Sequence, residues 1–140
     1  MRISRFLTAA GLALAVAITM SVSSLAQAKT DEDFDKLMKA VGAANGAMRG
    51  AAKEQNVAAI SAEATKMVAL FKDAEAFWKS RNNTEAAEWS ATAAKHADAV
   101  SKGTDAASIG GAMKELGGAC QSCHAKYREG APGAFTIKKG

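Results

Sequence analysis

The chain's only proline, Pro132, lies eight residues before its C-terminus, so no earlier proline breaks a helix. Alanine, which has the highest helix propensity, is abundant between residues 30 and 130. Within this stretch apolar residues recur at intervals of three and four, the spacing of one buried helix face. These patterns predict an all-α protein.

Short polar breaks divide this stretch into four predicted helical segments. The first is expected to begin after Thr30, an N-cap followed by acidic residues that suit the helix dipole. The later segments are expected to begin after Asn56, after the break 80–84 and near Thr104. Because breaks this short favour antiparallel neighbours, the predicted fold is an antiparallel up-down-up-down four-helix bundle.

Three glycines recur every four residues on one face of the first predicted helix: Gly42, Gly46 and Gly50. Each glycine lowers helix propensity, so a compensating role is expected. We expect this face to allow the close approach of another helix or of a flat cofactor. The alternative is weak selection within an alanine-rich helix.

The segment Cys120-Gln121-Ser122-Cys123-His124 contains both cysteines and one of the two histidines. Cys-x-x-Cys-His is the attachment signature of c-type haem. The thiols of Cys120 and Cys123 would join the porphyrin vinyl groups as thioethers, and His124 would give an imidazole nitrogen to the iron. The sequence therefore predicts one covalently bound haem c, attached in the last turns of the fourth helix.

Other readings of this motif involve different chemistry. A thioredoxin-like dithiol needs a βαβ context, which the helical pattern does not provide. A zinc site would have to recruit His96, and the adjacent Cys123 and His124 fit poorly around one tetrahedral ion. A structural disulfide between Cys120 and Cys123 is the remaining alternative.

Residues 1–28 have the pattern of a secretory signal peptide. Arg2 and Arg5 form the charged region, an apolar run follows over 6–20, and cleavage is expected after Ala28. A retained membrane anchor is less favoured, because serines interrupt the run before it reaches the roughly 20 apolar residues of a span. Export to the periplasm of a bacterium is therefore predicted, with no stable membrane insertion after cleavage.

Removal of 28 residues from 140 leaves a mature chain, 29–140, of 112 residues, which suits a single domain. Loss of Arg2 and Arg5 leaves 16 basic against 14 acidic residues. No basic run with interleaved aromatic residues is present, so nucleic-acid binding has no support. No catalytic triad, general base or substrate pocket is visible, so the protein is not expected to be an enzyme.

The predicted topology places the end of the fourth helix beside the start of the first, where Met38 lies. Met48 is about 15 Å further along the first helix, and Met113 about 16 Å from His124 along the fourth. Met38 is therefore the favoured sixth ligand of the iron, since a thioether can bind opposite histidine. The alternatives are that Met38 only fills the core, or that His96 is the ligand.

With these features the chain resembles the class II c-type cytochromes of the cytochrome c′ type. The resemblance is most specific over 117–128, which is similar to that family's haem-binding helix, and over 36–46, similar to its first helix. Many relatives have an Arg-Gln pair where this chain has Phe34-Asp35, so Lys126 or Arg128 would have to replace any propionate contact of that arginine.

The resemblance implies two behaviours. Members with methionine at the position of Met38 are low-spin electron carriers, whereas five-coordinate members bind small gases such as nitric oxide or carbon monoxide. We therefore expect a periplasmic monohaem electron carrier, monomeric or homodimeric, that exchanges electrons with redox partner proteins. The alternatives are a gas-binding protein, and a haem-free helical interaction module with a disulfide.

Overall fold

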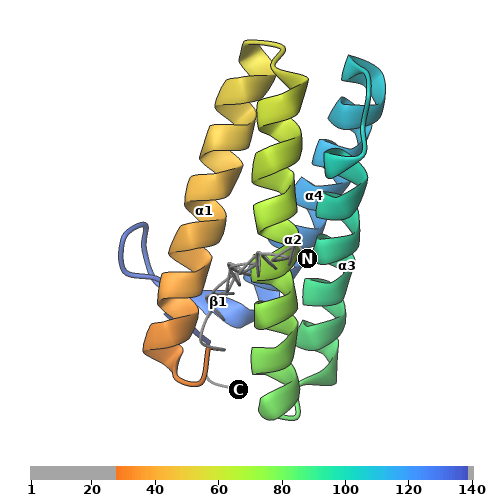
Figure 1. Ribbon diagram of the computed structural model, residues 1–140. Coiled ribbons are helices and arrows are strands. Elements are labelled where there is room, and N and C mark those ends of the chain that lie inside the picture. Colours follow the sequence, from red (N-terminus) through yellow and green to blue (C-terminus); the bar gives the residue numbers. More distant parts are fainter. Residues whose placement is uncertain (1–27, 139–140) are drawn as a thin grey trace, which may run out of the picture.

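The computed structural model describes residues 28–138, which form four long helices and a small C-terminal hairpin (Figure 1). The elements are α1 (Asp31–Lys53), α2 (Val57–Ser80), α3 (Thr84–Ser101), α4 (Ala106–Tyr127), β1 (Arg128–Glu129) and β2 (Thr136–Ile137). Short connections reverse the chain between successive helices, so the predicted all-α antiparallel bundle is confirmed. The predicted signal peptide lies outside the described residues, apart from Ala28.

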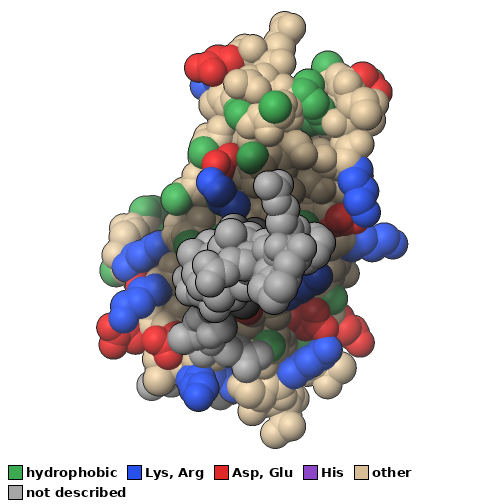
Figure 2. All heavy atoms as spheres, in the orientation of Figure 1, with side chains coloured by type: hydrophobic (Ala, Val, Ile, Leu, Met, Phe, Trp, Pro, Cys, Tyr) green, Lys and Arg blue, Asp and Glu red, His purple; other side chains and the backbone are tan. Residues whose placement is uncertain are grey.

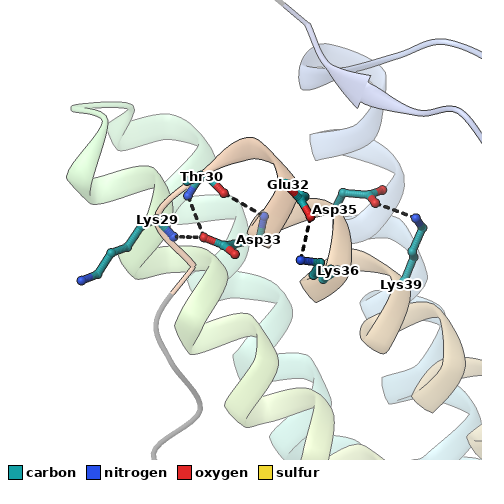
Figure 3. A network of polar contacts seen from close by, with 7 residues as sticks. All are labelled: Lys29, Thr30, Glu32, Asp33, Asp35, Lys36 and Lys39. Atoms are coloured by element: carbon teal, nitrogen blue, oxygen red, sulfur yellow. Dashed lines mark hydrogen bonds and ion pairs between the residues drawn. The ribbon is translucent and has the colours of Figure 1, made fainter.

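A side chain caps the start of every helix. Thr30 and Asp33 form a capping box at α1, in which each side chain accepts a hydrogen bond of 3.1 Å from the other's backbone N–H (Figure 3). These hydrogen bonds lower the pKa of the Asp33 carboxyl. Asn56, Asn83 and Asp105 accept hydrogen bonds from the first-turn amides of α2, α3 and α4. The predicted starts of the helices after Thr30 and Asn56 are confirmed.

Two hydrophobic clusters divide the core along the bundle. The larger one contains residues of all four helices, among them the fully buried Met48, Met67 and Leu116. The smaller one lies where α1 begins, α2 ends and α3 begins. Its members are Ala28, Leu37, Ala74, Phe77, Trp78, Ala86 and Ala87, and the residues packed against them include Phe34, Tyr127 and Ile137.

Aromatic rings join α1, α2 and α4 within the smaller cluster. Phe34 stacks on Phe77 at a centroid distance of 4.3 Å and meets Trp78 edge-on at 5.1 Å. Trp78 in turn lies 5.5 Å from the ring of Tyr127 at the end of α4. The start of α1 and the end of α4 therefore lie at the same end of the bundle, as the predicted topology requires.

The helices do not form a closed ring of contacts. α1 packs along α2, α2 along α3 and α3 along α4, whereas the backbones of α1 and α4 do not approach closely. β2 packs against α1 near this gap. The bundle is therefore open between its first and last helices, in the part of the chain described.

The glycine face of α1 does not contact another helix of this chain. No described atom lies within 4 Å of the position of a Cβ at Gly42, Gly46 or Gly50, and all three residues are exposed. The predicted approach of another helix is therefore wrong for the helices of this chain.

Side chains of both charge signs are mixed on the surface. On the face shown in Figure 2, lysine and arginine side chains lie among aspartates and glutamates, and no large area has a single sign. None of the helices within residues 28–138 is long and apolar enough to cross a membrane.

Candidate functional site

The last turns of α4 carry the predicted haem-attachment motif. Cys120 and Cys123 are half-buried free thiols, and His124 is also half-buried. Cys120 packs against the larger hydrophobic cluster. The helix therefore directs its motif partly into the core, where a covalently attached apolar group could be covered.

Burial controls the chemistry of the two thiols. Burial raises the pKa of the Cys120 thiol. Burial also raises the pKa of the Cys123 thiol, to about 11, with smaller contributions from the nearby Cys120 and Glu85. Redox-active dithiols instead have a lowered pKa, because the thiolate is the nucleophile. The arrangement therefore does not favour a thioredoxin-like function.

A zinc site is not assembled either. His96 lies half-buried on α3, and the described residues contain no group of three or more His, Cys, Asp or Glu side chains that could hold a metal ion. The structure therefore does not bring His96 into a common site with Cys120 and Cys123.

His124 lines an open depression of about 350 Å³ at the end of α4. The other lining residues are Gln121, Ala125, Arg128, Gly130 and Phe135. Burial, and then the nearby positive charge of Arg128, lower the pKa of His124. Both causes favour the neutral imidazole, which is the form that binds a metal ion.

Met38 lies in the second turn of α1, at the end of the bundle that contains the motif. Its half-buried side chain packs against both hydrophobic clusters, and Cys120 packs against the larger of these. Met48 and Met67 are 1% exposed within the core. Met38 is thus a partly accessible methionine at the end of the bundle that contains the motif, whereas Met48 and Met67 are enclosed by protein.

The Trp78 indole has an unsatisfied hydrogen bond. The side chain is only 4% exposed, so its Nε1–H is shielded from water, and no acceptor for this N–H is present among the described residues. Leaving such a donor unpaired costs about 1–3 kcal/mol. Trp78 lies between Phe34 and Tyr127, and Tyr127 follows His124 by three residues.

This donor fits a haem, whose propionates are carboxylate acceptors. Two thiols, a neutral imidazole and an unpaired buried N–H therefore form a set of groups suited to a c-type haem. Sequence reasoning placed Trp78 on a buried stripe, but no spacing pattern marks an indole whose N–H lacks a partner.

Glu85 is a second residue that the sequence did not reveal. Its Oε2 accepts hydrogen bonds of 2.5 Å from Lys126 Nζ and from the Tyr127 hydroxyl. These bonds lower the pKa of Glu85. They tie the start of α3 to the last turn of α4, directly after the motif.

A comparison with known families agrees with this geometry. The family model described as Cytochrome C' matches residues 69–128, from the middle of α2 to the first residue of β1. The match includes Cys120, Cys123 and His124 but not Met38. No curated protein and no solved structure matches the chain significantly. The segment 69–128 is therefore similar to the Cytochrome C' family, and the four-helix fold is compatible with that similarity.

Proposed function

We propose that the protein is a periplasmic monohaem c-type cytochrome that carries electrons. In this proposal Cys120 and Cys123 hold the haem as thioethers, and His124 and Met38 are the axial ligands of its iron. The observation that carries the proposal is the common location of Met38 and the motif at one end of the bundle. The family match over α4 supports the haem itself.

The protein's contribution would be to hold two neutral ligands in a dry site. A bound haem would supply reversible one-electron exchange between Fe(III) and Fe(II). The neutral imidazole of His124 and the thioether of Met38 add no charge, and burial disfavours the more charged ferric state. Both side chains come from helices fixed by aromatic packing, so little rearrangement is needed between redox states.

Absorption and electron paramagnetic resonance spectra of the purified, exported protein test this proposal. We expect a low-spin ferric spectrum and slow binding of carbon monoxide to the reduced protein. A high-spin ferric spectrum with rapid carbon monoxide binding would reject ligation by Met38. A mass without the haem increment would reject the cytochrome assignment altogether.

A gas-binding, five-coordinate protein is the second candidate. The match to the Cytochrome C' family model supports it as much as it supports the electron carrier, because the matched residues 69–128 do not include Met38. The carbon monoxide experiment above distinguishes the two candidates.

The cellular location and partners follow from the predicted export. We propose that cleavage after Ala28 releases the protein into the periplasm, where redox proteins deliver and accept its electrons. The N-terminal sequence and mass of the exported protein check the cleavage position. Sedimentation of the purified protein distinguishes a monomer from a homodimer.

A further inference from the structure

The C-terminal hairpin is an element that the matched family segment does not include, except for Arg128. It pairs β1 with β2 in an antiparallel register that places Arg128 opposite Ile137. Gly130 has a φ of 97°, and a Cβ there would clash with the carbonyl oxygen of Ala134. Only glycine fits this turn easily, so the hairpin has a defined conformation.

The hairpin is also anchored at both of its sides. The Lys138 N–H donates a hydrogen bond of 2.8 Å to the carbonyl oxygen of Tyr127 at the end of α4. Ile137 packs against the small aromatic cluster, and β2 packs against α1. The hairpin therefore connects the end of α4 to α1 at the open side of the bundle (Figure 1).

One large hydrophobic side chain of this hairpin is partly exposed. Phe135 is 37% exposed, and the only other exposed large hydrophobic residue among those described is Val57, at the start of α2. Phe135 lines the depression that contains His124. The guanidinium of Arg128 lies 4.0 Å from its ring centroid and so holds one face of the ring.

The character of the depression indicates what could cover Phe135. Its lining combines an aromatic ring, the imidazole of His124 and one formal charge, the cation of Arg128. A porphyrin has an apolar face and two carboxylates, so it would complement both the ring and the cation. Neither cysteine lines the depression, but Cys120 and Cys123 flank its lining residue Gln121 along α4, so a group attached to them would begin beside it.

We propose that Phe135 is a haem-contacting residue and that the C-terminal hairpin forms a wall of the haem pocket. This inference rests on the proposed attachment of haem to α4, but not on ligation by Met38. Arg128 would act as a positioning residue, because it holds the Phe135 ring in place. By covering the cofactor, the hairpin would exclude water and favour the less charged ferrous iron.

Nuclear magnetic resonance of the reduced, carbon-monoxide-bound protein gives a direct test. This form is diamagnetic whether or not Met38 is a ligand of the wild-type iron. We expect ring-current shifts of the Phe135 protons and nuclear Overhauser effects between them and haem substituents. Ring protons at unperturbed positions with no such effects would overturn the inference.

A redox titration of variants gives an independent readout. Phe135→Ala is expected to lower the midpoint potential, whereas Phe135→Leu should retain most of the wild-type value. Val57→Ala is the matched control, since it truncates the other exposed hydrophobic side chain at the opposite end of the bundle and should leave the potential unchanged. Equal potentials in the wild type and Phe135→Ala would also overturn the inference.

The experiment separates this inference from the proposed function. If the wild-type protein carries no covalent haem, as judged by its mass, the proposed function fails and the inference fails with it. If haem is present but neither Phe135 contacts nor a potential shift is observed, only the inference about the hairpin is overturned.

Discussion

The indole of Trp78 packs against the phenol ring of Tyr127, with 5.5 Å between the ring centroids. Phe34 contacts the same indole from α1 at 5.1 Å. Trp78, near the end of α2, therefore holds the last turn of α4 and the first turn of α1 in one cluster. Since the predicted haem-attachment motif ends three residues before Tyr127, this cluster brings the start of α1 to the end of the bundle that contains the motif.

The first prediction concerns the unpaired N–H of Trp78. Trp78→Phe keeps an aromatic ring in the cluster but removes the donor. If a haem propionate accepts this hydrogen bond, its loss leaves the carboxylate charge less compensated and favours Fe(III). The midpoint potential in a redox titration should therefore fall. Trp89→Phe is the control, because Trp89 is the other tryptophan and lies half-buried on α3; equal shifts in both variants would contradict the prediction.

The second prediction tests the sixth ligand. Met38→Ala should convert a low-spin ferric protein into a high-spin one and accelerate carbon monoxide binding to the reduced form, since one axial position becomes open. Absorption and electron paramagnetic resonance spectra report the change. Met48→Ala removes a methionine that is 1% exposed in the core.

The control variant Met48→Ala should lose stability but keep its ferric spin state. Met48→Ala is expected to lower the free energy of unfolding by about 2–5 kcal/mol, the usual cost of a buried methionine. Its ferric spectrum should remain low-spin. A spin-state change in Met48→Ala, or none in Met38→Ala, would contradict the assignment of Met38.

The helices and their order were predictable because their signals are local. Thr30 and Asn56 cap their own helices, and the three-and-four spacing of apolar residues identifies the buried face without reference to the rest of the chain. The location of the end of α4, with its motif, at the same end of the bundle as the start of α1 also followed, because successive antiparallel helices alternate in direction.

Contacts between distant residues were not predictable in the same way. Glu85 meets Lys126 across 41 positions in the sequence, and no pattern of spacing identifies such a pair. The open side between α1 and α4 depends on how all four helices pack together. The pairing of Arg128 with Ile137 likewise depends on the turn between β1 and β2. Gly130 and Gly133 adopt positive φ angles in this turn, which the sequence alone does not specify.

The third prediction concerns pH and Glu85. Hydrogen bonds from Lys126 and Tyr127 lower the pKa of Glu85 below its usual value of 4.5, so the ionised carboxylate stabilises the folded state. This contribution is fully present above about pH 4.5 and is lost as the pH falls through the lowered pKa. Because all three side chains are exposed or half-buried, the effect should be small.

Thermal unfolding of Glu85→Gln measures this contribution. The variant should melt slightly below the wild type at neutral pH, and the difference should disappear in acid. Glu88→Gln, on the same helix, should show no such pH-dependent difference. A difference for Glu85→Gln that grows as the pH falls would have the wrong sign and would contradict the role of this network.

The fourth prediction uses the glycines of α1. Gly46 is exposed, and a Cβ there would have no described atom within 4 Å. Gly46→Ala should therefore raise the free energy of unfolding by about 0.5–1 kcal/mol, the usual difference between the two residues within a helix.

Gly130→Ala should instead destabilise the hairpin, because its φ of 97° disfavours a side chain and its Cβ would meet the Ala134 carbonyl. Chemical denaturation checks both variants, and a stability loss in Gly46→Ala, accompanied by a change in sedimentation, would show that a second subunit occupies this face.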